Sequence, residues 1–207
     1  MIAYKFLASG AIAPFTGYCW PVPGASGAGA WVDAPDERPE HGVHACRIPD
    51  LAFWLDTELW RAELADPVAE GQRQVIGRRG RLLERVSGWD EGMARSFAEA
   101  CVWLARDRSA VALRAAALEG EAELLSRCHL LSDLHAVSKR LSSGVGLAAG
   151  ALAGYLAEAI DFLLAGDSPC ASYICARAAV IASGGIESEF AAERENQASL
   201  LAERLGL

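Results

Sequence analysis

The sequence has little lysine and none of the short motifs by which common enzymes are identified. Among its 207 residues only Lys5 and Lys139 are lysines, and every other basic residue is an arginine. The chain lacks a G-x-S-x-G nucleophile elbow, a phosphate-binding Walker loop, a dinucleotide-binding glycine pattern and an H-E-x-x-H metal motif. These absences argue against the enzyme classes that carry such motifs, and we expect no cofactor.

The chain also lacks a long hydrophobic run and a secretory signal. Its longest apolar stretch, residues 144–157, is followed by Glu158 and is shorter than the roughly 20 residues that cross a bilayer. The first residues, MIAYKFL, lack the basic segment and the cleavage site of a signal peptide. The six cysteines are scattered, which predicts reduced thiols. We therefore expect a cytoplasmic protein with no membrane partner.

The chain has more acidic than basic residues and is rich in alanine. The net charge is −8 and the isoelectric point is about 5.0. Such a negative field repels the phosphate backbone, so we expect no nucleic-acid partner. The preference for arginine over lysine, with abundant alanine and glycine, is typical of a bacterial genome rich in G and C. These features leave another protein as the expected partner and do not define an oligomeric state.

Composition changes near residue 88. Seven of the eight prolines lie at or before Pro67, and five of the six tryptophans lie at or before Trp89. Beyond this point the chain is rich in alanine and carries most of the net negative charge. The change predicts an α+β fold, in which a small mixed α/β region over residues 1–88 packs on a larger all-helical region over residues 89–207.

Short apolar runs punctuated by glycine and proline predict strands in the first region. Pro49 suits the first turn of a short helix, because a proline lacks the N–H that has no partner there. A loop over residues 9–29 follows the first strand. The expected strands are Ala3–Leu7, Ala30–Val32, Val43–Cys46, Glu58–Leu64, Gln72–Ile76 and Arg81–Val86.

The second region is predicted to contain about six helices. Asp90 is expected to cap the first helix, and Ser168 to cap a later one that has a proline at its first position. Glycines at 146, 150 and 154 predict a face of low bulk on which another helix packs closely. Further helices are expected over residues 109–125, over residues 128–141 and at the C-terminal end of the chain.

The densest polar cluster contains His41, His44 and Cys46. If residues 43–46 form a strand, His44 and Cys46 point to the same face, and His41 approaches from the preceding turn. The three side chains then resemble a zinc ligand set, with Cys19 as a distant fourth member. The alternatives are a polar edge-strand role for His44 and a buried, unreactive Cys46.

Two further groups of cysteine and histidine lie in the helical region. Cys128 and His135 are seven residues apart and share a helix face, whereas His129 lies about 100° away. A two-residue site and an ordinary core face are the two interpretations. Cys170 and Cys175 point in different directions on one helix, so we expect no shared ion there.

One local run is basic, Arg78-Arg79-Gly80-Arg81, with Arg73 and Arg85 nearby. Arginines of this kind bind a phosphate or a carboxylate with two parallel hydrogen bonds. The alternative, which we favour, is a solvated hairpin tip between two strands.

Four short segments of the first region resemble an uncharacterised module of phage and bacterial proteins that combines an AYK opening with a GFHAC motif and a short helix. The resemblance covers residues 3–65 and implies no known activity. The segments here are Tyr4-Lys5, Gly42–Cys46, Pro49–Leu51 and Trp60–Leu64.

The order of these segments also resembles, more distantly, an ADP-ribosyltransferase fold. In that reading Tyr4, His44 and Glu63 would be the catalytic residues, and NAD or a related nucleotide the substrate. The sequence departs from the family because Tyr4-Lys5 stands where a histidine or arginine is expected, and it lacks the Ser-Thr-Ser strand and the Glu-x-Glu pair.

The second region resembles alanine-rich helical immunity proteins, in the segment 176–179 and in the C-terminal residues 192–207. The function we expect from the sequence is therefore that of a non-enzymatic bacterial binding protein, of an immunity-like kind, with Trp54, Trp60 and Arg79 as binding residues. The alternative is a nucleotide-utilising enzyme.

Overall fold

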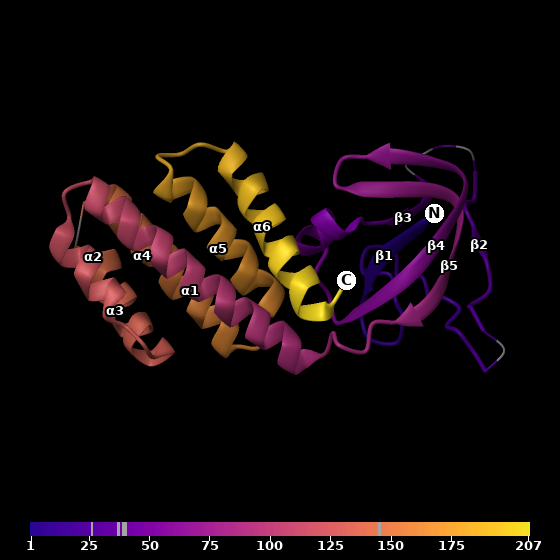
Figure 1. Cartoon of the computed structure of the whole chain (residues 1–207), viewed down its shortest axis with the longest axis horizontal. Coiled ribbons are helices and arrows are strands. Elements are labelled where there is room, and N and C mark those ends of the chain that lie inside the picture. Colours follow the sequence, from indigo (N-terminus) through magenta and orange to yellow (C-terminus); the bar gives the residue numbers. More distant parts are fainter. Residues whose placement is uncertain (26, 37, 39–40, 145) are drawn as a thin grey trace. The chain divides into compact units, whose positions relative to one another are not determined.

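The computed structural model describes residues 1–207 except residues 26, 37, 39, 40 and 145. Its contacts divide the chain into two units, which we call the β unit and the helical unit. The β unit comprises residues 1–93 and 198–207, and the helical unit comprises residues 94–197. The predicted α+β fold class is confirmed (Figure 1). The sequence placed the boundary at residue 88 and did not suggest that the last ten residues belong with the first unit.

An antiparallel sheet forms the β unit. Strand β1 (Ile2–Leu7) pairs with β4 (Glu58–Gly71), which pairs with β5 (Gln74–Arg85). The short strands β2 (Val32–Asp33) and β3 (Val43–Ala45) both pair with β5. An isolated β-bridge between Tyr4 and Cys46 then connects β1 to the residue that follows β3. The pairings therefore run through β1, β4, β5 and β3 and back to β1, so the sheet curls around an inner face.

The inner face of this curled sheet holds an apolar core. Alternate residues of each strand point inward, since side chains alternate along a strand. Trp20, from the loop after β1, fills the same core. The core residues are Ala3, Leu7, Ala11, Trp20, Val43, Ala45, Trp60, Ala62, Leu64, Val75 and Leu82.

Strands β4 and β5 form one long hairpin, visible as two curved arrows in Figure 1. The sequence predicts three shorter strands here, because Gly77 and Gly80 look like breaks between them. Both glycines lie inside β5 and serve close packing instead. A Cβ at Gly80 would lie 2.6 Å from Cγ1 of Val43, and one at Gly77 would lie 3.0 Å from Cβ of Leu64.

A short 3₁₀ helix, η2 (Ile48–Phe53), has Pro49 in its first turn as predicted. Its buried Asp50 accepts a 2.8 Å hydrogen bond from Nε of Arg47 and lies 3.7 Å from Nη1 of Arg73. Arg73 belongs to the turn of the β4–β5 hairpin and has a left-handed backbone, with φ of 60°. Asp50 therefore ties η2 to this turn.

Helices make up the rest of the chain. Helix α1 begins at the predicted cap, since Oδ1 of Asp90 accepts a hydrogen bond of 2.7 Å from the Met93 amide. None of the described helices is long and apolar enough to cross a membrane. The helices are α1 (Glu91–Ala115), α2 (Glu119–Ser126), α3 (Leu131–Gly144), α4 (Leu147–Leu164), α5 (Ser168–Ala182) and α6 (Ser188–Leu205).

Three helical predictions need correction. The helix predicted over residues 109–125 does not form as one element: its start is the end of α1, the chain breaks at Ala117, whose φ is 59°, and its remainder is in α2. The cap of α5 is Asp167 rather than Ser168. Two of the three glycines in the predicted face of low bulk do not mark a close approach, because a Cβ at Gly154 would meet only Cβ of Ser142, at 3.9 Å, and one at Gly146 would meet nothing.

Candidate functional site

The three candidate catalytic residues lie on neighbouring strands, where each has a structural partner. Glu63 accepts hydrogen bonds from Arg81, with 2.8 Å to Nε and 2.7 Å to Nη2. Nδ1 of His44 lies 3.0 Å from Oε1 of Gln74. Tyr4 is bridged to Cys46 through its main chain, with both hydrogen bonds under 3 Å. The Glu63 carboxylate is therefore already engaged in an ion pair between neighbouring strands.

The histidine–cysteine cluster of the β unit is not assembled as a metal site. Nδ1 of His41 lies 2.8 Å from Oδ2 of Asp36, and the pKa of Asp36 lies below its usual range because Arg38 and His41 hydrogen-bond to it. Cys46 is buried, and burial raises the pKa of its thiol to about 12. Within the residues that the structure describes, no three His, Cys, Asp or Glu side chains are grouped so as to hold a metal ion.

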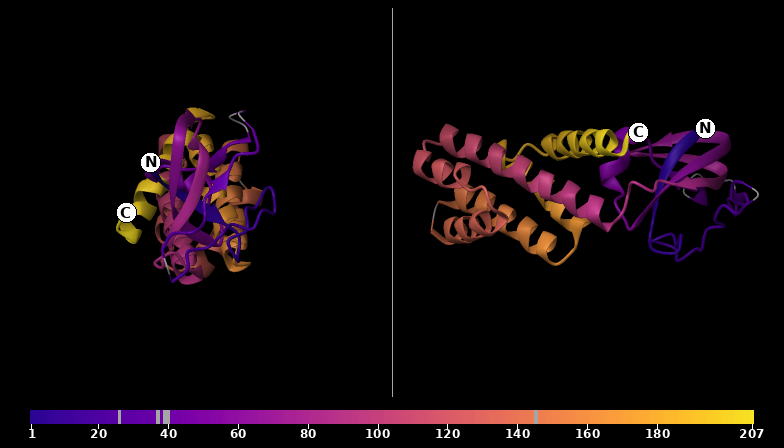
Figure 2. Two further views of the ribbon diagram at one scale, coloured as in Figure 1. Left: turned by 90° about the vertical axis from the view of Figure 1, so that its right-hand side faces the viewer. Right: turned by 60° about the horizontal axis from the view of Figure 1, so that its bottom comes forward.

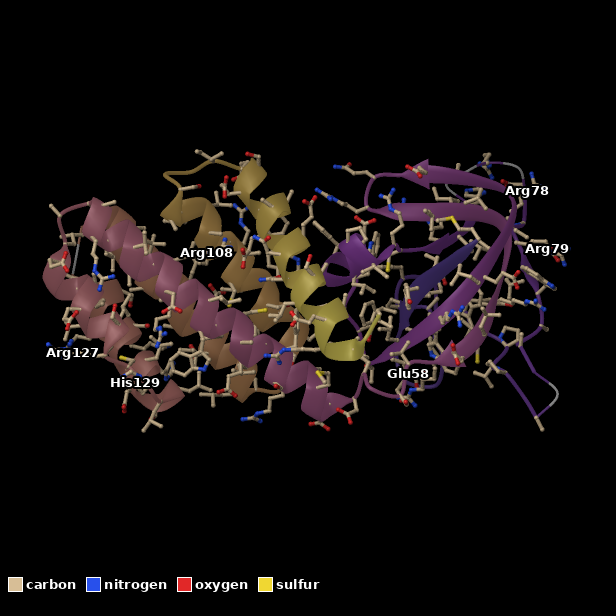
Figure 3. All side chains as sticks on the ribbon, in the orientation of Figure 1. Glu58, Arg78, Arg79, Arg108, Arg127 and His129 are labelled. Carbon is tan, nitrogen blue, oxygen red and sulfur yellow. The ribbon has the colours of Figure 1, made fainter. Side chains whose placement is uncertain are left out.

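The basic run lies within strand β5, so its interpretation as a hairpin tip is wrong. Arg79 stacks over the Trp31 ring, with its guanidinium carbon 4.8 Å from the ring centroid, and its Nε lies 3.3 Å from Asp33. Arg81 stacks over the same ring at 4.6 Å. Figure 3 shows Arg78 and Arg79 at one side of the sheet, well apart from Glu58. Since carboxylates already pair with Arg79 and Arg81, this run is a weak candidate for an anion site.

The two predicted tryptophan anchors have structural roles. Trp60 is 8% exposed, lies in the inner core and donates from Nε1 to Glu58 at 2.9 Å. Its burial leaves little of the ring for a partner to contact. Trp54 is half-buried and donates from Nε1 to the Arg73 carbonyl at 2.6 Å, which holds η2 against the β4–β5 turn.

The cysteine–histidine groups of the helical unit do not form a joint site either. Cys128 lies between α2 and α3, so it does not share a helix face with His135 as predicted, and its buried thiol is positioned to donate to the Leu124 carbonyl at 3.2 Å. Nε2 of His135 lies 2.8 Å from Asp161 on α4. Burial raises the pKa of Cys175, which is 2% exposed. These side chains stabilise helix packing.

The feature that sequence reasoning missed is a small hairpin in the loop after β1, residues 11–20, which we call the N-terminal hairpin. Main-chain hydrogen bonds close it, from Trp20 to the Ala11 carbonyl at 3.0 Å and from Ala13 to the Tyr18 carbonyl at 2.8 Å. Phe15 lies at its turn and is 87% exposed, and Tyr18 is 46% exposed. In the right-hand view of Figure 2 this indigo part of the chain extends away from the strands.

The base of the N-terminal hairpin is fixed by Glu58. Its carboxylate accepts hydrogen bonds of 3.1 Å from the amides of Gly10 and Ala11, whose φ angles are 80° and 58°. Burial alone would raise the pKa of Glu58, but hydrogen bonds from Trp60, Gly10 and Ala11 and the charge of Arg85 outweigh it, so the pKa lies below its usual value. A buried carboxylate therefore holds the turn that starts the hairpin.

One sequence signal could have identified this surface. No charged residue occurs between Lys5 and Asp33, so the whole loop is built from apolar, small and uncharged polar side chains. Loops are normally hydrophilic, and conspicuous apolar side chains on a loop indicate a contact surface.

Comparison with models of known protein families finds no match to this chain, and comparison with curated proteins and with solved structures finds no similar protein.

Proposed function

We propose that this protein is a non-catalytic binding protein that captures a partner protein with its N-terminal hairpin. The observation that carries the proposal is the nearly complete exposure of Phe15 on a hairpin whose base is fixed. A partner that covers this phenyl ring removes it from water, which favours binding, because burial of a large apolar side chain is worth about 1.5–3 kcal/mol.

The base of the hairpin supports this proposal because it is rigid. Trp20 is buried in the inner core, and Tyr18 contacts it edge to face with ring centroids 5.9 Å apart. A preformed loop loses little conformational entropy on binding, so more of its contact energy appears as affinity. Aromatic side chains on such loops are also the residues most enriched at the centres of protein interfaces.

The composition of the loop defines the partner surface that fits it. Ile12, at 38% exposed, and Val22, at 54%, flank the two aromatic residues, and the loop carries no charge. The matching surface is an uncharged apolar pocket on a protein, wide enough for one phenyl ring. The enzyme alternative has less support, because the Glu63 carboxylate already forms an ion pair with Arg81.

The experiment compares proteins retained from a lysate of the source organism by the wild type, by Phe15→Ser and by Val111→Ser. Val111 is 64% exposed on α1 and is the matched control for loss of an exposed apolar side chain. We expect Phe15→Ser to lose a protein that the other two retain, with a dissociation constant raised about 30-fold or more once the partner is purified. Identical retained proteins for all three chains would contradict the proposal.

A further inference from the structure

Lys5 lies in an unusual place for a lysine, on the inner face of the curled sheet. Strand β1 places it between Ala3 and Leu7, both core residues, and the β1–β4 register sets it opposite Trp60, which is also in the core. Lysine is rarely found among core residues, because removing an ammonium group from water is costly.

The contacts of the Lys5 amine are uncharged. Nζ donates to the His44 carbonyl at 2.5 Å and lies 4.9 Å from the centroid of the Trp20 ring. In the part of the chain that the structure describes, it forms no ion pair with a carboxylate. The residue as a whole is partly exposed, while its amine lies in an apolar setting.

The second lysine provides a natural contrast. Nζ of Lys139 pairs with Oδ2 of Asp161 at 2.7 Å, and its side chain is 54% exposed. The amine of Lys139 is thus held as an ion-paired cation in the helical unit, whereas the amine of Lys5 lies in an apolar, uncharged setting in the β unit. Burial lowers the pKa of Lys5 to about 8, against a smaller opposing effect of Cys46.

We propose that Lys5 is a modification site, at which the amine is acylated by small activated acyl donors such as acyl phosphates and acyl thioesters. The neutral amine attacks the acyl carbon, so that a C–N bond forms. The bond from that carbon to the phosphate oxygen or the thiolate sulfur breaks, and the electron pair leaves with the phosphate or thiolate. The proton lost from the nitrogen goes to solvent, and the product is an amide.

The surroundings of Lys5 suit an amide better than the other product expected of a reactive amine. An amide is uncharged, so acylation removes the positive charge from this apolar setting. The amide also keeps one N–H to donate to the His44 carbonyl. A neutral imine formed with an aldehyde would have no N–H and would leave that carbonyl without this donor. The site therefore favours acyl transfer over imine formation.

The test uses the two lysines of the wild-type chain as internal controls for each other. The folded protein is incubated with acetyl phosphate, and in a separate arm with acetyl-coenzyme A, between pH 6.5 and 10. Peptide mass spectrometry measures the acetylation rate of Lys5 and of Lys139. At pH 8 about half of an amine of pKa 8 is neutral, against less than about 1% of an ordinary lysine. Even with its lower intrinsic nucleophilicity, Lys5 is expected to react about tenfold faster.

A repeat in denaturing urea separates the effect of the fold from that of local sequence. The rate advantage of Lys5 is expected to disappear there, and in the folded protein its rate is expected to level off above pH 8 while that of Lys139 still rises. Lys5→Arg is expected to leave Lys139 acetylation unchanged. Equal rates for the two lysines in the folded protein, or an unreactive Lys5 in both arms, would overturn the proposal.

Discussion

The two units of this protein bury charged groups in different ways. In the β unit, Glu58 binds main-chain amides and Lys5 binds a main-chain carbonyl, although the buried Asp50 there pairs with arginine side chains. In the helical unit, buried charges bind other side chains, as in the ion pair of Arg108 with Glu193.

The helical unit extends this arrangement into a small network. Arg194 donates from Nη1 to Gln197 at 2.8 Å and to Ser172 at 3.2 Å, and the Gln197 amide donates to the Ser172 carbonyl at 3.0 Å. Burial lowers the pKa of Arg194 to about 10. The residues come from α5 and α6.

The difference follows from where free main-chain groups occur. A helix uses most of its own amides and carbonyls internally, so a charge buried between helices pairs with side chains or with a carbonyl beyond a helix end, as Arg106 does with the Cys128 carbonyl at 2.8 Å. Turns and short strands leave main-chain groups available, and the β unit uses them at Gly10, Ala11 and His44. The contacts that shape the proposed binding surface therefore depend on backbone conformation, and those that stabilise the helical unit depend on pairs of side chains.

The largest effect is expected from breaking a side-chain pair of the helical unit. Arg108→Ala leaves the Glu193 carboxylate, which is 2% exposed, without its ion-pair partner. We expect the free energy of unfolding of the helical unit to fall by about 3 kcal/mol at pH 7, as measured by urea denaturation followed by circular dichroism. Arg127→Ala is the control, because Arg127 is 77% exposed and its pair with Glu123 is worth about 0–1 kcal/mol. Equal losses in the two variants would contradict this view.

The Arg108→Ala loss should also depend on pH. Burial raises the pKa of Glu193 above its usual value, so the folded state binds this proton more tightly than the unfolded state does. Stability linked to Glu193 is therefore highest at low pH and falls as pH rises from about 4.5. Without Arg108 this fall should become steeper, and the difference between variant and wild type should shrink at pH 5. A difference independent of pH would show that charge at Glu193 is not its cause.

A smaller loss is expected from Glu58→Gln in the β unit. The change removes a charged acceptor shared by two amides and the Trp60 indole, and should cost about 2 kcal/mol. Five of the six tryptophans lie in the β unit, so tryptophan fluorescence during urea denaturation measures this loss. Because the pKa of Glu58 is lowered in the folded state, its contribution should be present above about pH 4.5 and lost as pH falls. Glu84→Gln, at an exposed position, is the control.

Lys5 should change the stability of the β unit at alkaline pH, whereas Glu58 changes it at acidic pH. Its pKa of about 8 in the folded state lies below the 10.5 of a free lysine, so the unfolded state binds more protons between these values. Stability should therefore rise with pH from about 8 to 10.5, by about 1–2 kcal/mol. Lys5→Met should remove this rise, and Lys139→Met should leave it in place. A rise that persists in Lys5→Met would assign it to other groups.

The smallest effect on stability is expected at the hairpin turn itself. Phe15→Ser removes a side chain that is 87% exposed, so the free energy of unfolding should change by less than about 0.5 kcal/mol. The same urea denaturation measures it. A larger loss would mean that Phe15 packs against the β unit, and would remove the basis for treating it as a contact residue.

The sequence predicted the strands and the short helix well where side-chain pattern decides them. A short apolar and aromatic run located β1, and Pro49 located η2. It failed where packing decides, since Gly77 and Gly80 look like breaks until the approach of Leu64 and Val43 is known. The helix break at Ala117 carries no signal either, because alanine does not normally adopt a left-handed backbone.

The candidate site was predicted less well, because contacts between residues distant in sequence decide most of it. The inward position of Lys5 follows from its alternation with Ala3 and Leu7 and was available from the sequence. The role of Glu58 was not, because it depends on a turn at Gly10 and Ala11 that is distant in sequence. Trp60 was predicted to be a binding residue, and only the sheet register shows that it points inward.

Hydrogen exchange of the chain with and without its captured partner tests most directly whether binding belongs to the β unit. The account predicts slower exchange of main-chain amides in residues 11–20 when the partner is added, with no change in helices α2 and α3 of the helical unit. Protection confined to the helical unit, with the N-terminal hairpin exchanging as in the free chain, would contradict it.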